Sequence, residues 1–413
     1  MIRIDSRPSP ASTAIAVVAA ALLGLGVVMV LSASASLTAR PVTERPFSNP
    51  VWRQASFSFA ALIMMLMVGL CPYESWRIRR RSWFQPAVFL SVITLALLAA
   101  VLVPGIGDAR HGARRWISLG PAAAGLGFQP SELAKPAMVI LLAGLCSRMG
   151  ERVRHFFTGL LPLLLIIAAA GGLVGVEDFG TAVLLFVVGG CVLLGAGAKL
   201  WHLIVCSLPA AVGFAYLAIS KPYRVERLVS FLDPFADAQG RGYHQVQSLI
   251  TIASGGWWGR GVGAGIQKYG YLPEGRSDFV FAVICEELGI IGGIAVLGLF
   301  AVLLWGGRRA MLNAGTEFGR LLALGISLTV GFQAAMNVAV VTVSVPPKGI
   351  GLPLVSAGGT GVILFGLLLG LLINVARDRS HRPAVEALPD ICRMTAPPQS
   401  DRTPRHAPLA PSL

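Results

Sequence analysis

The chain has 413 residues, of which 55% are hydrophobic and 13% charged, whereas about a quarter of the residues of a soluble domain carry charge. Many of its apolar runs reach the roughly 20 residues that cross a bilayer as a helix, which excludes a soluble globular domain. The formal charge of +14 could suggest a nucleic-acid partner. Its lysines and arginines, however, gather in short connectors between apolar runs, as in membrane proteins. We therefore expect no nucleic acid and predict an all-α, polytopic membrane protein.

The apolar sequence divides into about ten predicted spans at glycine, proline and charged breaks. The first apolar run follows a short basic leader, residues 1–12, and resembles a signal peptide. It is too long for the apolar core of one, so we interpret it as an uncleaved first span. The break at residues 197–200 is weak, so that region has an alternative division. The predicted spans cover residues 13–37, 51–71, 86–104, 132–148, 157–175, 181–198, 200–219, 279–304, 318–344 and 353–375.

Basic residues mark one end of the predicted transmembrane domain, residues 13–375. They include Arg77, Arg79, Arg80, Arg81, Arg148, Arg152, Arg154, Lys199, Arg308, Arg309, Arg320, Arg377 and Arg379. The positive-inside rule places these connectors and both termini in the cytoplasm, so we expect a multi-pass protein of the cytoplasmic (inner) membrane. The long segments 105–131 and 220–278 then face outward. Residues 376–413 are polar and rich in proline and arginine, and we predict a disordered cytoplasmic tail.

Charged residues surround the start of the fourth predicted span. Arg114 and Arg115 lie in Gly112-Ala-Arg-Arg-Trp-Ile-Ser-Leu-Gly120 and could bind lipid headgroups in general. In Gln129-Pro-Ser-Glu-Leu-Ala-Lys135 the proline suits a first helical turn. Glu132 and Lys135 then share one helix face. A local ion pair and a functional pair explain this spacing equally well.

A very short outward turn, Val176-Glu-Asp-Phe-Gly-Thr-Ala182, joins two spans and contains the carboxylates Glu177 and Asp178. Turn and helix-cap chemistry explains such a segment without any further role. On the residues alone, this structural interpretation of Asp178 is the favoured one.

The large loop, residues 220–278, contains two recognisable segments. Tyr243, Val246, Leu249, Ile250 and Ala253 fall on one helical face and indicate a short interfacial helix. Glycines at 255–265 could suggest a nucleotide-binding loop, but no strand precedes them. We predict a flexible re-entrant turn there.

Three carboxylates lie at the junction of this loop with the next span. Asp278 is at the start of the helix and is a candidate N-cap. It is equally a candidate general base, because partial desolvation raises the pKa of a carboxylate into a useful range. Glu286 and Glu287 lie about two turns deeper and are either functional or structural hydrogen-bonding groups.

Glycines and prolines dominate residues 346–361, Pro346-Pro-Lys-Gly-Ile-Gly-Leu-Pro-Leu-Val-Ser-Ala-Gly-Gly-Thr-Gly361. Such a segment before an apolar helix permits close backbone approach and broken-helix geometry. Its single lysine, Lys348, we expect to be solvated.

Taken together and in this order, the motifs resemble the SEDS family, the FtsW/RodA/SpoVE group of polytopic peptidoglycan polymerases. The resemblance covers nearly all of residues 13–375. It rests on residues 112–117, 129–135, 231–234, 245–248, 272–281, 286–289 and 348–359. Each motif is a modest signal, and their joint occurrence on matching loops is highly specific. Gly-Ala-Arg-Arg-Trp and Pro-Lys-Gly lean toward the FtsW branch, which serves cell division.

The resemblance implies a fold of about ten spans with a large extracytoplasmic loop before helix 8. It also implies polymerisation of lipid II into β-1,4 glycan on the outer face, with release of undecaprenyl pyrophosphate. Its partners would be a class B penicillin-binding protein transpeptidase and other divisome or elongasome membrane proteins. The family's essential aspartate falls on Asp278, which becomes the catalytic candidate. The substrate-binding candidates are Lys135, Glu132, Arg114, Arg115, Asp178, Glu274 and Ser356.

The sequence departs from the family pattern at three places. Glu177 replaces the usual proline of the Pro-Asp-x-Gly-Thr turn, and Ser277 replaces a threonine beside Asp278. Residues 356–361 read Ser-Ala-Gly-Gly-Thr-Gly in place of Ser-Tyr-Gly-Gly-Ser-Ser, which removes a tyrosine hydroxyl. This last change concerns how the loop holds substrate rather than Asp278.

The implied reaction requires a base for the acceptor hydroxyl and cations for the departing pyrophosphate. Asp278 suits the first role and Lys135, oriented by Glu132, the second, with Arg114 and Arg115 as weaker candidates. No metal-ligand spacing is present, although a divalent cation (Mg or Mn) could assist. Two alternatives remain: a lipid II flippase, and a catalytically inactive scaffold that activates its penicillin-binding partner.

Overall fold

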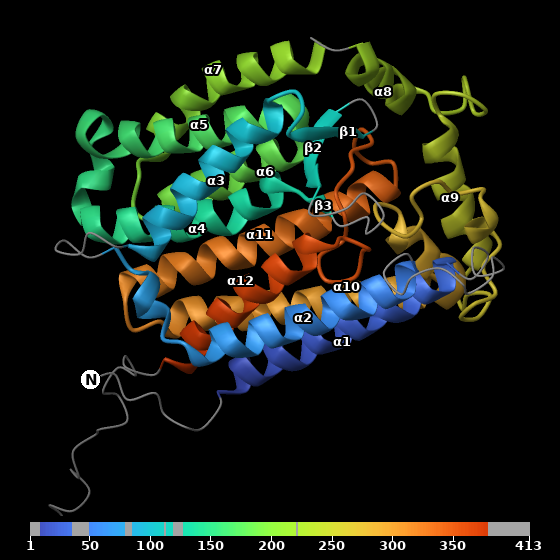
Figure 1. The fold of residues 1–413 in the computed structure, drawn as a ribbon, viewed down its shortest axis with the longest axis horizontal. Coiled ribbons are helices and arrows are strands. Elements are labelled where there is room, and N and C mark those ends of the chain that lie inside the picture. The colour runs from blue at the N-terminus through green and yellow to red at the C-terminus, as the bar shows by residue number, and fades with distance from the viewer. Residues whose placement is uncertain are drawn as a thin grey trace, which may run out of the picture. The chain divides into compact units, whose positions relative to one another are not determined.

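The computed structural model describes residues 9–34, 49–78, 85–110, 113–118, 127–219 and 222–378 (Figure 1). Most of the predicted leader and tail lie outside these residues. Among these residues, seven helical segments are long and apolar enough to cross a membrane. Five are α1 (Pro10–Ser34), α2 (Pro50–Leu70), α10 (Val280–Asn313), α11 (Glu317–Val341) and α12 (Thr360–Arg377). The other two are Pro130–Arg154, which contains α4 (Pro130–Met149), and Phe156–Glu177, which contains α5 (Leu161–Glu177). Shorter apolar helices are α3 (Pro86–Leu102), α6 (Phe179–Gly195) and α7 (Leu200–Ile219). The prediction of a mostly helical, polytopic membrane fold is confirmed, with a helix at each predicted span.

Helix α12 packs closely along α2 and also contacts α1, α10 and α11 (Figure 1). Two glycines of α12 explain the close approach to α2. A Cβ atom at Gly366 would lie 2.4 Å from the Ala61 carbonyl oxygen, and one at Gly370 would lie 2.7 Å from that of Met65. Small residues let membrane helices approach backbone to backbone, where dispersion contacts replace the hydrophobic effect.

The basic connectors meet at one end of the helices. There Tyr73 donates a hydrogen bond of 2.6 Å to Oδ2 of Asp378 and lies 3.1 Å from the hydroxyl of Thr316. Arg320 donates to the Gly195 carbonyl at 2.7 Å. Since successive helices run in opposite directions, the α5–α6 turn and the segments before α4, α10 and α12 all lie at the other end.

A small antiparallel sheet forms within the long segment 105–131, which we had predicted only as an outward loop. Its strands are β1 (Gly107–Arg110), β2 (Ala113–Ser118) and β3 (Gly127–Phe128), in the order β1-β2-β3. Ile117 pairs with both Gly107 and Phe128. The sheet places Arg114 and Arg115 of β2 against the α5–α6 turn.

The large loop contains α8 (Pro222–Leu232), which was not predicted, and α9 (Tyr243–Gly255), which was. On the predicted apolar face of α9, Val246 is buried and Ile250 and Ala253 are exposed. The polar residues Gln245, Ser248 and Thr251 are buried. Ser248 donates to the Val341 carbonyl at 2.7 Å, so polar contacts as well as apolar ones seat α9 on the bundle.

The glycine-rich segment after α9 is held by Glu286 and Glu287, both 0% exposed. Glu286 Oε1 accepts from the backbone N–H of Ile266 at 2.7 Å, and Glu287 Oε2 accepts from that of Gly263 at 3.0 Å. Ser32 of α1 donates to Glu287 Oε1 at 2.5 Å. These bonds correct the prediction of a flexible turn, and they assign the two glutamates a structural role in the described part of the chain.

Candidate active site

Asp278 lies at the end of the large loop, two residues before α10, and its side chain is half-buried. The N-cap position of α10 belongs to Phe279, and no side chain in the described part of the chain caps that helix. Within the described residues the Asp278 carboxylate accepts no hydrogen bond; only its backbone carbonyl does, from Nδ2 of Asn337 at 2.7 Å. The capping interpretation of Asp278 is therefore wrong.

The surroundings of Asp278 raise the pKa of its carboxyl from 3.8 to about 7. Burial is the largest cause, followed by the negative charge of Glu274. Arg115 and Arg227 oppose these effects, and Asp178 adds a small increase. A carboxylate with a pKa near neutrality and no hydrogen-bond donors is suited to accept a proton.

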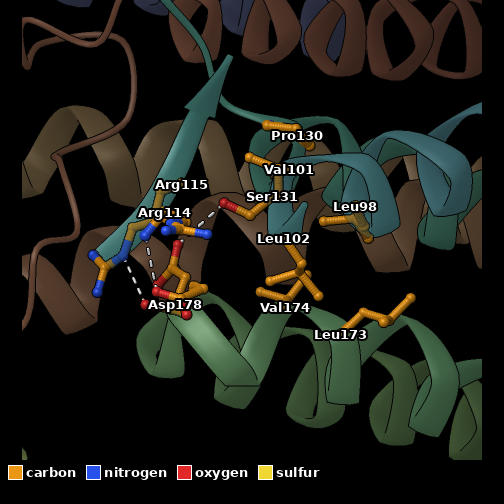
Figure 2. Close-up of a pocket in the computed structure, with 11 residues that line it drawn as sticks. Leu98, Val101, Leu102, Arg114, Arg115, Pro130, Ser131, Leu173, Val174 and Asp178 are labelled. Carbon is orange, nitrogen blue, oxygen red and sulfur yellow. Dashed lines mark hydrogen bonds between the residues drawn. The ribbon is translucent and has the colours of Figure 1, made fainter. Parts of the chain in front are cut away.

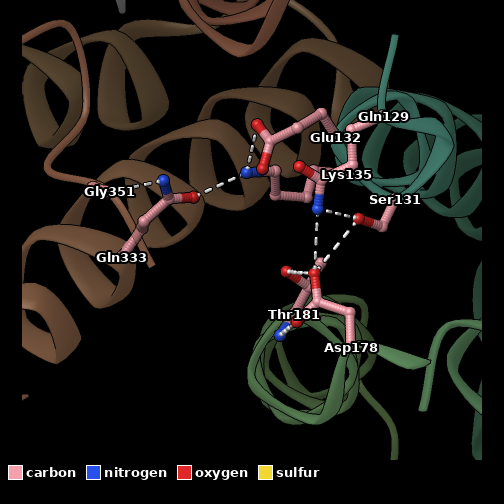
Figure 3. A network of polar contacts seen from close by, with 8 residues as sticks. All are labelled: Gln129, Ser131, Glu132, Lys135, Asp178, Thr181, Gln333 and Gly351. Carbon is pink, nitrogen blue, oxygen red and sulfur yellow. Dashed lines mark hydrogen bonds and ion pairs between the residues drawn. The ribbon is translucent and has the colours of Figure 1, made fainter. Parts of the chain in front are cut away.

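Lys135 is 3% exposed, although it lies less than two turns inside α4. Its ammonium lies 2.7 Å from Oε2 of Glu132 and donates to Oε1 of Gln333 at 2.7 Å (Figure 3). It also lies 4.9 Å from the ring centroid of Phe365. The predicted shared face of Glu132 and Lys135 is confirmed, and the pair lies at the same end of the helices as Asp278.

Asp178 is 5% exposed and is the N-cap of α6. Its carboxylate accepts from the N–H of Thr181 at 3.1 Å and from the Thr181 hydroxyl at 2.8 Å. It also accepts from Ser131 at 3.1 Å and from Gln129 at 3.2 Å (Figure 3). These four donors join the α5–α6 turn to the start of α4, which favours the structural interpretation of this residue.

Arg114 and Arg115 are half-buried and meet the α5–α6 turn through Glu177. Glu177 Oε2 accepts from the backbone N–H of Arg114 at 2.9 Å, and its carbonyl accepts from Nε of Arg115 at 2.7 Å. Glu177, which replaces the family's usual proline, thus positions the strand that carries both arginines.

A pocket opens beside these arginines (Figure 2). Its polar end contains Arg114, Arg115 and Asp178, and its wall is apolar and comes from α3 and α5. The apolar lining residues are Leu98, Val101, Leu102, Leu173 and Val174. The pocket is a small cavity of about 20 Å³ in which charged side chains meet an apolar wall.

Glu274 and Ser356, from two loops, both bind Ser277, the residue before Asp278. Glu274 has a φ of 54°, in the left-handed region that few non-glycine residues adopt, and its Oε2 accepts from Ser277 at 2.8 Å. Ser356 is 4% exposed, donates to the Ser277 carbonyl at 2.6 Å and accepts from the N–H of Leu352 at 2.6 Å. Ser356 therefore braces the last loop against the residue before Asp278.

Three further residues at this site were not predicted. Lys348 is half-buried, not solvated as expected; its ammonium lies 4.7 Å from the Phe179 ring centroid. Burial lowers the pKa of Lys348, and the charge of Asp178 opposes that change. Gln333 and Asn337 are buried amides on α11. Their sequence signal was a pair of polar residues four apart within an apolar span.

Among the described residues, no group of three or more His, Cys, Asp or Glu side chains is arranged so that it could hold a metal ion. The cationic side chains that the described geometry brings to this end of the helices are Arg114, Arg115, Lys135, Arg227 and Lys348.

The fold and this site define a polytopic membrane protein with a carboxylate-centred polar site at one end of its helices. The chain belongs to the SEDS family: the family described as "Cell cycle protein" (FTSW_RODA_SPOVE) matches residues 12–381. It is similar to the "Probable peptidoglycan glycosyltransferase FtsW" of Thioalkalivibrio sulfidiphilus (strain HL-EbGR7), with 41% identity over 365 residues, 86% of each chain.

Two solved structures share the fold. One is described as "Structural coordination of polymerization and crosslinking by a peptidoglycan synthase complex"; its TM-score is 0.68 at 30% identity, covering 88% of this chain and 97% of the other. The other is the rod shape determining protein RodA of Thermus thermophilus, with a TM-score of 0.61 at 27% identity, covering 89% and 97%.

Proposed function

We propose that the chain is a peptidoglycan glycosyltransferase of the FtsW type that polymerises lipid II during cell division, with Asp278 as its general base. The observation that carries the assignment of the base is the state of the Asp278 carboxylate. It is half-buried, its pKa is raised to about 7, and it accepts no hydrogen bond within the described residues.

The reaction joins the 4-hydroxyl oxygen of an acceptor sugar to the anomeric carbon of the donor sugar. The bond from that carbon to the pyrophosphate breaks, and the hydroxyl proton passes to Asp278. Direct displacement inverts the anomeric centre and gives a β-1,4 linkage. A carboxylate with a pKa near 7 accepts the proton at neutral pH and releases it to solvent afterwards.

Negative charge develops on the departing pyrophosphate, and cations fixed in advance stabilise it. Arg114 and Arg115 are half-buried at the polar end of the pocket (Figure 2). Lys135 is deeper and already paired with Glu132. We therefore assign contact with the pyrophosphate mainly to the two arginines. Lys135 adds positive charge from a more deeply buried position.

The site faces the outside of the cytoplasmic membrane in this proposal, with both termini in the cytoplasm. The distribution of charge supports this orientation, because short basic loops stay on the cytoplasmic side. The connectors at the end of the helices opposite the site carry Arg77, Arg152, Arg154, Lys199 and Arg309. A class B penicillin-binding protein is the proposed partner. The similar complex described as coordinating polymerisation and crosslinking supports that choice.

The test is polymerisation of lipid II by the purified chain, co-expressed with its class B partner, as wild type and as Asp278→Asn. We expect a glycan ladder that the variant loses. The matched control is Asp237→Asn, because Asp237 is an exposed aspartate of the same loop that accepts only local backbone bonds in the described structure. A ladder from folded Asp278→Asn would remove Asp278 as base. No ladder from the wild type would favour the flippase or scaffold, which a lipid II translocation assay would separate.

A further inference from the structure

Two amides on α11, Gln333 and Asn337, are four residues apart and lie on one face of the helix. Their exposed fractions are 5% and 0%. Buried amides in a membrane helix are retained where their hydrogen bonds are needed, because an unpaired polar group in an apolar environment costs free energy.

Gln333 uses both ends of its amide at the site (Figure 3). Its Oε1 accepts from the ammonium of Lys135 at 2.7 Å, and its Nε2 donates to the carbonyl of Gly351 at 3.0 Å. The ammonium is thus held between Glu132 on its own helix and an amide on a neighbouring helix.

Asn337 uses both hydrogens of its amide nitrogen on backbone carbonyls. Nδ2 donates to the carbonyl of Asp278 at 2.7 Å and to that of Ile350 at 2.8 Å. One side chain therefore fixes the end of the large loop against the loop before α12.

The two amides act on adjacent carbonyls, Ile350 and Gly351, so their bonds form one connected set. It runs from Lys135 through Gln333 and the 350–351 backbone to Asn337 and Asp278. Helix α11 spaces the two amides rigidly, as a support for reacting groups requires.

We propose that Gln333 and Asn337 are positioning residues of the transferase, which hold the Asp278 backbone and the Lys135 ammonium in a fixed relation through the 350–351 backbone. This inference rests on the proposed roles of Asp278 and Lys135. Neither amide has to touch substrate. Each acts through the group it holds.

The chain offers a matched control in Asn374 of α12, which is 7% exposed. Its Nδ2 donates to the Gly69 carbonyl at 3.0 Å, and its Oδ1 accepts from the N–H of Tyr73 at 3.0 Å. Asn374 is thus a buried amide that bridges two backbone segments, but at the opposite end of the helices.

The experiment compares Asn337→Leu, Gln333→Met and Asn374→Leu, each co-purified with the class B partner, by lipid II polymerisation per folded molecule. We expect kcat to fall about 10- to 100-fold in the first two, because a displacement near 1 Å of a reacting group costs about 100-fold. KM should change less than about threefold, since the lost interaction serves the transition state. Asn374→Leu should lower the midpoint of thermal unfolding and leave kcat unchanged.

Asn337→Asp keeps the volume of the side chain and provides a second readout if Asn337→Leu does not fold. Its carboxyl would be buried against the carbonyls of Asp278 and Ile350, which favours the protonated form. A protonated carboxyl donates one hydrogen bond where the Asn337 amide donates two, so one of the two loops is released. We expect kcat to fall while KM changes little, whereas a merely structural role of Asn337 would lower only the midpoint of thermal unfolding.

The outcomes separate the inference from the proposed function. If Asp278→Asn is inactive while Gln333→Met and the Asn337 variants keep wild-type kcat, the positioning role is wrong and the base stands. An equal loss of kcat in Asn374→Leu would also overturn the positioning role. If Asp278→Asn is active, the base is wrong and the inference falls with it.

Discussion

A Cβ atom at Gly349 would lie 3.1 Å from Oδ2 of Asp278, so the loop between α11 and α12 passes directly beside the carboxylate. Contacts closer than about 3.4 Å require a neighbour to move, and here the neighbour is the proposed base. The φ of Gly349 is outside the left-handed region, so a larger residue there meets the carboxylate rather than backbone strain.

Gly349→Ala should therefore lower kcat for lipid II polymerisation about tenfold or more, with little change in the thermal unfolding midpoint. Gly358→Ala is the control, since a Cβ there meets Val362 at 3.5 Å and the Ser356 carbonyl at 3.6 Å, which are ordinary contacts. Equal activity of the two alanine variants would show that substrate approaches Asp278 from another side.

The pH dependence of the reaction should follow the Asp278 carboxyl. A base works only when deprotonated, so kcat should fall about tenfold per pH unit below its pKa of about 7 and level off above it. Burial is the largest cause of the raised pKa, which predicts a midpoint well above that of an ordinary aspartate.

Neighbouring charges should move that midpoint in opposite directions. Glu274 raises the pKa of Asp278, so Glu274→Gln should move the midpoint to lower pH. Arg227 lowers the same pKa, so Arg227→Gln should move it to higher pH. Shifts of the same sign in both variants would contradict this electrostatic account. A pH–kcat profile of each purified complex measures the effect.

The spans could be predicted because a membrane helix requires a long apolar run with a break at each end, and composition alone records both. The small sheet β1-β2-β3 and helix α8 could not. Both segments are short and polar, and the sheet forms against the α5–α6 turn, which is distant in sequence.

Some residues of the candidate site could likewise be predicted from the sequence, and others could not. Asp278, Glu132 and Lys135 could be found because a charge beside an apolar run is costly. The roles of Asp178 and Ser356 depend on donors from residues 129–131 and on the backbone at 277 and 352. No local pattern encodes those partners. Asn337 and Gln333 could have been found, because two amides one helical turn apart in an apolar span are a signal of a buried polar contact.

The ion pair of Lys135 and Glu132 should be separable into a stability effect and an activity effect. Glu132→Leu leaves an ammonium that is 3% exposed without its carboxylate, and breaking such a pair costs about 3–5 kcal/mol. The double variant Glu132→Leu, Lys135→Met removes both charges and should regain much of that stability.

Activity should return only in part in the double variant, because Arg114 and Arg115 remain but the positive charge that Lys135 adds near the pyrophosphate is gone. The stability and activity of the double variant are compared by measuring thermal unfolding in detergent and lipid II polymerisation on one preparation. A stable and fully active double variant would show that the pair serves only the end of α4.

Gly265 lies against the two buried glutamates that hold the glycine-rich segment. A Cβ there would lie 2.9 Å from Oε2 of Glu286 and 3.0 Å from Oε1 of Glu287. Gly265→Ala should therefore displace both carboxylates and weaken their bonds to the N–H groups of Gly263 and Ile266. Amide hydrogens of residues 256–267 should exchange faster, because local opening requires less free energy when those bonds are lost.

The control is Gly298→Ala on α10, since a Cβ there has no described atom within 4 Å. Its amide hydrogens should exchange as in the wild type. Unchanged protection in Gly265→Ala would mean that the segment is held mainly by its other backbone bonds, such as Arg260 to the Glu286 carbonyl at 3.0 Å.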